Sequence, residues 1–528
     1  MKTLYSILLL LLTCLPHVYG QLVIDSTRFI TGVRPGTSIK FSIPTSDKGI
    51  LFVGEEYGNP GGIIPYFPID TGIDGNVLIG KIDSNQQISW IKVYGGSNTD
   101  GAGSACQTPD GGYAVLAGTA SSDGDVTGFL GVTDIWLLRI DSLGNLLWEK
   151  CYGSPDEDGA ISIANTPDHG FVILGVSNGS GDDVPFHYGS TGYFDWVVIK
   201  TDSIGNVQWS KDLGGTGDEG DGAILAIDSA YYIVSNSNST DHDCTDSFWH
   251  IGVPTGLNIY ILKLDDTGKV LWDSSYGGTG SDDANYAMFD TRDSTIVAVG
   301  FTYSNNYMVT GYQGDGDMWV VKVNTNGTPI WEKTLGSTNM ENGTGICAGP
   351  NGGYIVYGST YPGPIGGEDC WVFALDSTHN EISNIIFGGS QGQDPNSVLP
   401  YLNGYVTTGL GGSSFTEGTT YGNFDSVGGG FVSYIDYWPL GVKNINNYVE
   451  SIAVYPNPSN ENITIVTPQN INGNILCFNS MGQEIFSQKT EQGNKYNQIN
   501  VSGWISGMYL IKWQAEDGNV ETTKFVKN

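Results

Sequence analysis

One sequence unit recurs along most of this chain, and its spacing limits the folds that the chain can adopt. Each unit contains a hairpin whose first strand is apolar on both faces, as in residues 134–140, and whose turn opens with Asp or Asn. These turn residues are Asp83, Asp141, Asp202, Asp265, Asn324, Asp376 and Asp436, which subtraction places 58, 61, 63, 59, 52 and 60 residues apart. A strand that is apolar on both faces belongs between packed sheets. A strand-rich repeat of this period predicts an array or a propeller.

Two other positions of the hairpin repeat as well. A Lys or Arg stands two residues before five of the turn residues, and a Trp holds one position of the second strand in five units. These residues are Lys81, Arg139, Lys200, Lys263 and Lys322, and Trp90, Trp148, Trp209, Trp272 and Trp331. Two further strands precede each hairpin and no helical period is present, so each unit predicts one four-stranded propeller blade. We expect the repeated basic and aromatic residues to serve this scaffold.

The last unit has only three strands, because Pro439 lacks an amide donor and disfavours a central strand. At the other end of the repeats, residues 21–32 resemble a fourth strand without its own blade. We therefore predict an all-β fold, a seven-bladed β-propeller over residues 21–438. Pairing of residues 22–29 beside residues 431–436 is expected to close it and leave no open sheet edge.

The first 20 residues are predicted to be a signal peptide. Lys2 precedes the apolar run 7–12, and Gly20 is a small residue at the expected cleavage point. Cys14 follows a poor lipidation sequence, because Thr13 stands where a smaller residue is preferred. No other apolar run is long enough to span a bilayer. We expect an exported mature chain without a transmembrane segment.

Charge and cysteine content exclude several kinds of partner. The formal net charge is −34, with only 22 Lys and Arg residues, which argues against nucleic acid and anionic membranes as partners. Six cysteines follow residue 20, with neither a C-x-x-C motif nor metal-ligand spacing: Cys106, Cys151, Cys244, Cys347, Cys370 and Cys477. Free thiols are expected, and a Cys347–Cys370 bridge within one unit is the alternative.

A different and smaller all-β module, predicted as a β-sandwich over residues 451–528, follows a linker at residues 439–450. Its motifs are Val454-Tyr-Pro-Asn-Pro458, Asn462-Ile-Thr-Ile-Val466, Asn479-Ser-Met-Gly-Gln-Glu-Ile-Phe486, Gly507-Met-Tyr-Leu510 and Lys524-Phe-Val-Lys527. This order of motifs resembles the type A-like C-terminal sorting domain of Bacteroidetes type IX secretion. The sorting residues that the resemblance implies are Tyr455, Pro456, Asn457, Pro458, Gly482, Gly507, Tyr509 and Lys524.

The same resemblance implies the type IX secretion machinery as a partner. It also implies transport across the outer membrane to the cell surface or the extracellular space. The repeat units in turn resemble the tandem repeats of exported Bacteroidetes proteins, a resemblance that brings no known chemistry with it.

Sequence variation is concentrated in the connections between the second and third strands of the units. These loops are residues 56–75, 120–133, 177–193, 237–257, 302–316, 359–368 and 411–428. In a propeller they share one face with the connections between blades, and variable loops on a fixed scaffold are typical of a binding surface. The ligand-binding residues predicted there are Phe186, Tyr188, Trp249, Tyr307 and Tyr312. Trp249 lies outside every repeated position, and its alternative role is a small core for its own long loop.

Acidic residues on the same face suggest calcium as a bound ion. The pairs are Asp123 and Asp125, Asp182 and Asp183, Asp241 and Asp243, and Asp315 and Asp317. None follows the EF-hand pattern, and turn chemistry explains most of them. No other cofactor is expected.

The favoured function is glycan binding or adhesion through the variable loops. The alternatives are a glycoside hydrolase or lyase with carboxylates near the propeller axis, and a purely structural surface protein. No motif of nucleophilic catalysis or phosphate binding stands in a suitable context.

Overall fold

The computed structural model divides the chain into two compact units, Met1–Leu440 and Gly441–Asn528, referred to as units 1 and 2. It describes residues 21–29, 37–57, 75–189, 192–245, 257–365, 367–389, 392–402, 404–411, 429–438, 453–455, 459, 461–467, 472–479, 483–490, 496–515 and 520–527. Within these residues the secondary structure is β-strand, apart from one short 3₁₀ turn, η1 (Pro350–Gly352). The all-β prediction is therefore confirmed.

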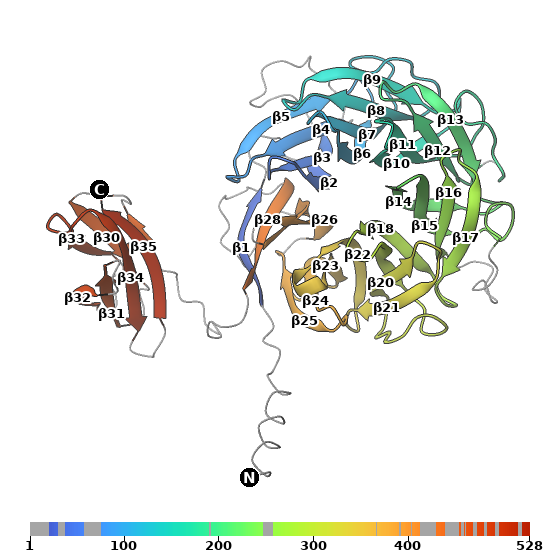
Figure 1. The fold of residues 1–528 in the computed structure, drawn as a ribbon. Coiled ribbons are helices and arrows are strands. Elements are labelled where there is room, and N and C mark those ends of the chain that lie inside the picture. The colour runs from blue at the N-terminus through green and yellow to red at the C-terminus, as the bar shows by residue number, and fades with distance from the viewer. Residues whose placement is uncertain are drawn as a thin grey trace, which may run out of the picture. The chain divides into compact units, whose positions relative to one another are not determined.

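The described part of unit 1 contains seven four-stranded antiparallel sheets (Figure 1). Three sheets are β2 (Ser38–Pro44), β3 (Ile50–Tyr57), β4 (Gly75–Ile82) and β5 (Ile88–Tyr94); β6 (Asp100–Gln107), β7 (Tyr113–Thr119), β8 (Asp134–Ile140) and β9 (Leu146–Tyr152); and β10 (Asp158–Asn165), β11 (Phe171–Ser177), β12 (Asp195–Thr201) and β13 (Val207–Leu213). Three more are β14 (Glu219–Ile227), β15 (Ala230–Ser237), β16 (Asn258–Asp265) and β17 (Val270–Tyr276); β18 (Asp282–Asp290), β19 (Thr295–Thr302), β20 (Asp317–Asn324) and β21 (Pro329–Leu335); and β22 (Met340–Ala348), β23 (Tyr354–Tyr361), β24 (Asp369–Leu375) and β25 (Glu381–Phe387).

The remaining sheet of unit 1 joins the two ends of the repeats. Its strand order is β1 (Gln21–Phe29), β28 (Gly429–Trp438), β27 (Gly404–Gly411) and β26 (Gln393–Tyr401). As the sequence predicted, β1 runs antiparallel to β28, from the pair Gln21 and Trp438 to the pair Phe29 and Phe431. The amide nitrogen of Leu22 also donates a hydrogen bond to Oγ of Ser383 in β25, at 3.1 Å.

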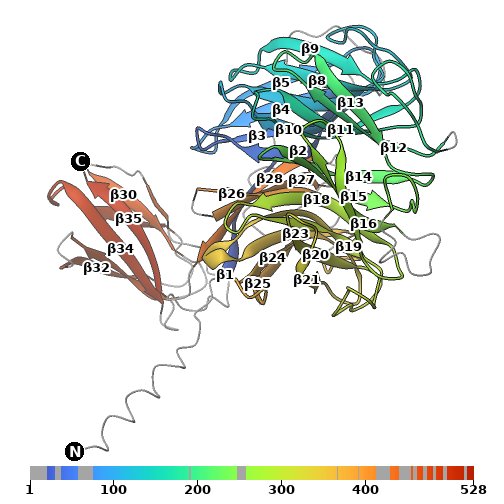
Figure 2. The same ribbon diagram turned by 45° about the vertical axis from the view of Figure 1, so that its right-hand side comes forward.

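The first strands of the sheets lie toward a common centre, and the fourth strands lie outermost (Figures 1 and 2). Each first strand contacts the first strand of the next sheet along the chain, and β26 also contacts β2. The repeated units therefore pack side by side through their faces.

Apolar side chains fill the spaces between neighbouring sheets. All seven residues of β8 are buried, as expected for a strand that is apolar on both faces. Trp136 and Leu138 of β8 lie in one core with Leu51 and Val53 of the preceding sheet. Side chains of the β2–β5 sheet, such as Phe52, also share a core with the β26–β28 sheet.

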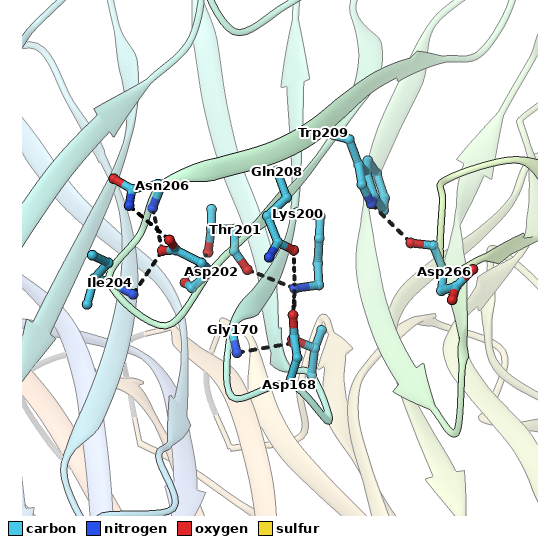
Figure 3. A network of polar contacts seen from close by, with 11 residues as sticks. Asp168, Gly170, Lys200, Thr201, Asp202, Ile204, Asn206, Gln208, Trp209 and Asp266 are labelled. Atoms are coloured by element: carbon cyan, nitrogen blue, oxygen red, sulfur yellow. Dashed lines mark hydrogen bonds and ion pairs between the residues drawn. The ribbon is translucent and has the colours of Figure 1, made fainter.

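The repeated basic residue in the third strand binds the turn between the first two strands of its own sheet. Nζ of Lys200 lies 2.8 Å from Oδ2 of Asp168 and also donates to the carbonyl of Thr201 (Figure 3). Arg139 and Asp110, and Lys81 and Asp47, repeat this arrangement. The cations are buried, so the ion pair satisfies a charge that burial alone would destabilise. The predicted scaffold role is confirmed for these residues.

The turn between the third and fourth strands contacts the preceding sheet. Its Asp accepts backbone hydrogen bonds, as Asp202 does from Ile204 and Asn206, and its Gly adopts positive φ. Gly205 lies against the ring of Trp148, where an added Cβ would be 2.8 Å from Cζ3. The hydroxyl of Tyr152 donates to the carbonyl of Gly205 at 2.7 Å. The repeated Trp is therefore half-buried beneath the turn of the next sheet.

The cysteines are free thiols within the described residues. Cys347 and Cys370 are both buried, and Sγ of Cys370 accepts a hydrogen bond from the hydroxyl of Tyr357 at 3.2 Å. The alternative of a Cys347–Cys370 bridge is thus not the arrangement present.

Unit 2 consists of two sheets around one core. The sheets are β29 (Ala453–Tyr455), β30 (Asn462–Val466) and β33 (Tyr496–Asn500); and β32 (Glu484–Thr490), β31 (Gly473–Phe478), β34 (Gly507–Ala515) and β35 (Val520–Lys527). Ile463 and Ile499 of the first sheet pack with Ile511, Trp513 and Phe525 of the second. Two sheets that bury their inner faces against each other form the predicted β-sandwich.

We predict that Gly205→Ala lowers the melting temperature more than Gly111→Ala does. Both glycines have positive φ, at +79° and +86°, so both variants carry the cost of about 1–2 kcal/mol for a left-handed residue. Only Gly205 has a ring where the Cβ would go, which adds roughly 1–3 kcal/mol of overpacking. Equal melting temperatures in thermal denaturation would contradict the inter-sheet role of the turn.

Candidate functional site

The loop between β11 and β12 carries two of the predicted ligand-binding residues, and the structure brings them together. Phe186 is 52% exposed and packs edge-to-face on Tyr188, with the ring centroids 4.7 Å apart. Tyr188 stacks on His242, from the loop after β15, at 4.3 Å. Burial, and after it the charge of Asp243, raises the pKa of Tyr188 to about 12. This Phe186–Tyr188–His242 cluster joins loops of two neighbouring sheets.

The other predicted residues come from different places. Tyr307 and Tyr312 lie in the loop between β19 and β20, which belongs to another sheet. Tyr307 is half exposed, and the hydroxyl of Tyr312 accepts a hydrogen bond from the amide of Gly316 at 3.2 Å. Trp249 lies outside the described residues, so its role stays a prediction.

Most acids on this face anchor the loops. Asp134 accepts hydrogen bonds from the amides of Leu130 and Gly131, at 2.6 and 3.0 Å. Asp123 accepts one from the amide of Ser97, at 2.8 Å. Asp282 accepts one from the amide of Gly278, at 2.7 Å. These bonds fit the turn-chemistry alternative, and calcium binding by the Asp pairs stays a prediction.

One carboxylate departs from this pattern. Asp212, near the end of β13, is only 7% exposed, yet neither of its oxygens has a hydrogen-bond partner among the described residues. The equivalent positions of the other fourth strands are Val93, Cys151, Ser275, Thr334 and Ile386. A buried carboxylate without a partner is costly, so a position that the repeat otherwise fills with small or apolar residues is a functional candidate.

Asp212 faces a histidine and further acids from neighbouring elements. Donor atoms of His187, Asp195 and Asp212 lie within 4.8 Å of one another. Nδ1 of His187 is 2.9 Å from Oδ2 of Asp195, but neither ring nitrogen is aligned for a hydrogen bond. Glu219, the first residue of β14, and Asp243 also act on the charge of Asp212. Imidazole nitrogen and carboxylate oxygens in this arrangement are able to hold a divalent cation.

Burial and mutual repulsion disfavour the charged forms of these acids. Burial raises the pKa of Asp212 to about 9, with added repulsion from Asp195, Asp243 and Glu219. Burial likewise raises the pKa of Asp195 and of Glu219. In the absence of a cation, Asp212 therefore keeps its proton at neutral pH.

A hollow lies where the first strands of the sheets converge. It encloses about 340 Å³, and its polar lining includes Lys40, Glu55, Asp221, Asn285, Asn342 and Asn396. Nδ2 of Asn285 donates to Oδ1 of Asn342 at 2.6 Å, which links two of these strands. Glu55 and Asp221 are the carboxylates that line this axial cavity.

The sorting residues are described only in part. Tyr455 belongs to β29, Gly507 opens β34 with φ +154°, and Lys524 lies in β35. Tyr509 is buried, packs on Trp504 at 4.8 Å, and donates to the carbonyl of Ile505 at 2.5 Å. Pro456, Asn457, Pro458 and Gly482 lie outside the described residues.

Among the described residues, no helix has the length and apolar character needed to cross a lipid bilayer.

Comparisons with known proteins give one family match. Residues 453–528 match the model of the secretion system C-terminal sorting domain. Ulvan lyase NLR42 of Nonlabens ulvanivorans is 32% identical over 80 residues. The matched segment is 15% of this chain, and it spans only 15% of the length of that relative.

Two solved structures are similar to this chain at low identity. One is a protein of unknown function from Dyadobacter fermentans, with TM-score 0.42, 10% identity, and coverage of 79% of this chain and 99% of that chain. The other is Drosophila Semaphorin 2a, with TM-score 0.43, 7% identity, and coverage of 97% and 98%.

The motifs from Tyr455 to Lys524, the two-sheet module and the family match coincide in one segment. Residues 453–528 are therefore a type IX secretion C-terminal sorting domain, which directs export of this protein across the outer membrane to the cell surface or the extracellular space.

Proposed function

We propose that unit 1 is a closed seven-bladed propeller that binds a glycan through the loops between its second and third strands. Aromatic exposure carries this proposal. The exposed Phe and Tyr side chains in the described part of unit 1 are Phe186, Tyr193, Tyr303, Tyr307 and Tyr361. All of them lie in these loops or at the strand end that opens one. Flat, stiff rings suit the C–H faces of sugars and lose little entropy on binding.

Loop contacts support a preformed surface. The ring of Phe186 packs edge-to-face on Tyr188, which in turn stacks on His242. Asp and Asn side chains nearby supply acceptors and donors for hydroxyl groups. A net charge of −34 favours neutral or cationic polymers over anionic ones.

A carbohydrate-active enzyme is the second candidate, because Glu55 and Asp221 line the same axial cavity. Hydrolysis would release reducing ends, and a lyase would form unsaturated products. Neither product is expected if unit 1 only binds. A purely structural surface protein would bind no glycan.

Closure of the propeller predicts a stability effect. Deleting residues 21–32 removes β1, which leaves an edge of β28 unpaired and takes Leu22 out of its core. The deletion should lower the melting temperature of the protein, measured by circular dichroism. A truncated chain that melts at the same temperature as the full chain would rule out a stabilising closure.

The sorting domain predicts an export defect. Removing residues 524–528 deletes the end of β35, including the buried Phe525, and should leave the protein in the periplasm with unit 1 folded. Cell fractionation measures this outcome. Lys489→Ala, in β32 of the same module, is the control and should be exported normally. Efficient export of the truncated protein would show that this end is not needed for secretion.

Glycan binding predicts a loss of affinity on removal of one ring. For a glycan identified on an array, Phe186→Ala should weaken binding about tenfold, which corresponds to roughly 1.4 kcal/mol. The control is Ile204→Ala, which removes an exposed side chain from the turn after β12. Binding to a neutral glycan should persist in high salt, unlike charge-steered protein adhesion.

Trp249→Ala separates the two roles of Trp249. A tenfold loss of affinity is expected for a stacking ring. Unchanged binding with a lower melting temperature would assign Trp249 to the core of its own loop.

A further inference from the structure

We propose that His187, Asp195 and Asp212 form a binding site for a divalent transition-metal ion such as Zn²⁺ or Mn²⁺. One imidazole nitrogen and two carboxylates are the ligands that these ions accept, whereas Ca²⁺ and Mg²⁺ prefer oxygen alone. The site joins three elements: the loop before β12, the start of β12 and the end of β13.

The geometry suits a single shared ion. The three donor atoms lie within 4.8 Å of one another, and ligands about 2.1 Å from a metal are themselves roughly 3–4 Å apart. Nδ1 of His187 and Oδ2 of Asp195 approach to 2.9 Å without the alignment of a hydrogen bond.

Burial supplies a second and independent observation. Asp212 is 7% exposed and Asp195 is fully buried, and both oxygens of Asp212 and Oδ1 of Asp195 have no hydrogen-bond partner among the described residues. The buried ammonium of Lys200, in the same sheet, is paired with the carboxylate of Asp168. The other lysine of the two strands, Lys211, is exposed to solvent. A cation taken from solvent, in exchange for the proton of Asp212, would supply the counter-charge for these carboxylates in their ionised form.

The repeat shows that this sheet has been altered at matched positions. In four other sheets a Trp or Tyr of the third strand donates to a side chain of the fourth. These pairs are Trp136 and Glu149, Tyr260 and Asp273, Trp319 and Glu332, and Trp371 and Asn384. In the β10–β13 sheet, Val197 and Ser210 hold these two positions.

The acid of this sheet stands two residues further on, as Asp212, directly opposite Val197. Paired side chains on neighbouring antiparallel strands lie on the same face. Replacing a large ring with Val therefore leaves room beside Asp212 for the side chain of His187. Loss of the aromatic side chain alone would not explain why a buried acid, Asp212, stands on the face where that side chain is missing.

The site also fixes the loops that carry the aromatic cluster. The amide of Tyr188, the residue after His187, donates to Oδ2 of Asp195 at 2.5 Å. His242, from the next sheet, stacks on the ring of Tyr188. A metal bound to His187 would hold the β11–β12 loop to its own sheet, whatever ligand the loop face binds.

Isothermal titration of the purified, chelator-treated protein with ZnCl₂, MnCl₂, CaCl₂ or MgCl₂ alone tests the site. One equivalent of Zn²⁺ or Mn²⁺ should bind more tightly than Ca²⁺ or Mg²⁺ and should raise the melting temperature. Asp212→Ser introduces the residue that β17 has at the equivalent position, Ser275, so the variant should fold. It should weaken binding by more than the roughly 10–100-fold that loss of an outer-shell partner costs.

Two further variants complete the test. His187→Gln should lose the preference for Zn²⁺ or Mn²⁺ while keeping all the acids in place. Asp266→Ser, at an exposed turn residue on the other side of the sheets, should bind as the unaltered protein does. Absence of stoichiometric binding to the unaltered protein, or equal affinity in Asp212→Ser and Asp266→Ser, would overturn the proposal.

Discussion

Burial of the third strand on both faces is the constraint on which unit 1 depends. A strand such as β8, with Ile135 and Leu137 on one face and Trp136 and Leu138 on the other, cannot be covered by its own sheet. It needs a neighbouring sheet on each side, and each neighbour has the same need. Successive units meet this need for one another, and contacts run from each first strand to the next and from β26 to β2.

The strands and their pairing could be predicted from the sequence because they depend on local features that repeat along the chain. The alternation of apolar residues, the Asp and Gly of each turn, and the lack of a fourth strand at Pro439 each have a local cause, and together they specify the pairing of β1 with β28. The sorting module could be predicted for a different reason, since its motifs stand close together in the chain. Only the partners of the repeated side chains, such as Trp148 beneath Gly205, needed coordinates.

Only part of the candidate site could be predicted from the sequence. Phe186 and Tyr188 stood out as loop aromatics, but His187 seemed to lack metal spacing because its companions are 8 and 25 residues away, by subtraction from Asp195 and Asp212. These residues meet only after β12 and β13 pair. A signal was nevertheless present: with the fourth strands aligned on their Trp, Asp212 is the carboxylate among Val, Cys, Ser, Thr and Ile.

The tryptophan beneath the turn of the next sheet has a mechanical consequence. It acts in one direction, from each sheet to its successor, and it is absent at two junctions: Ser383 takes its place in β25, and the strand Gln21–Phe29 contains no Trp. The sheet that joins both ends of unit 1 therefore lacks this Trp contact with the neighbouring sheet on each side. We therefore expect heat or tension to separate this sheet from its neighbours first, while the remaining sheets stay packed against one another.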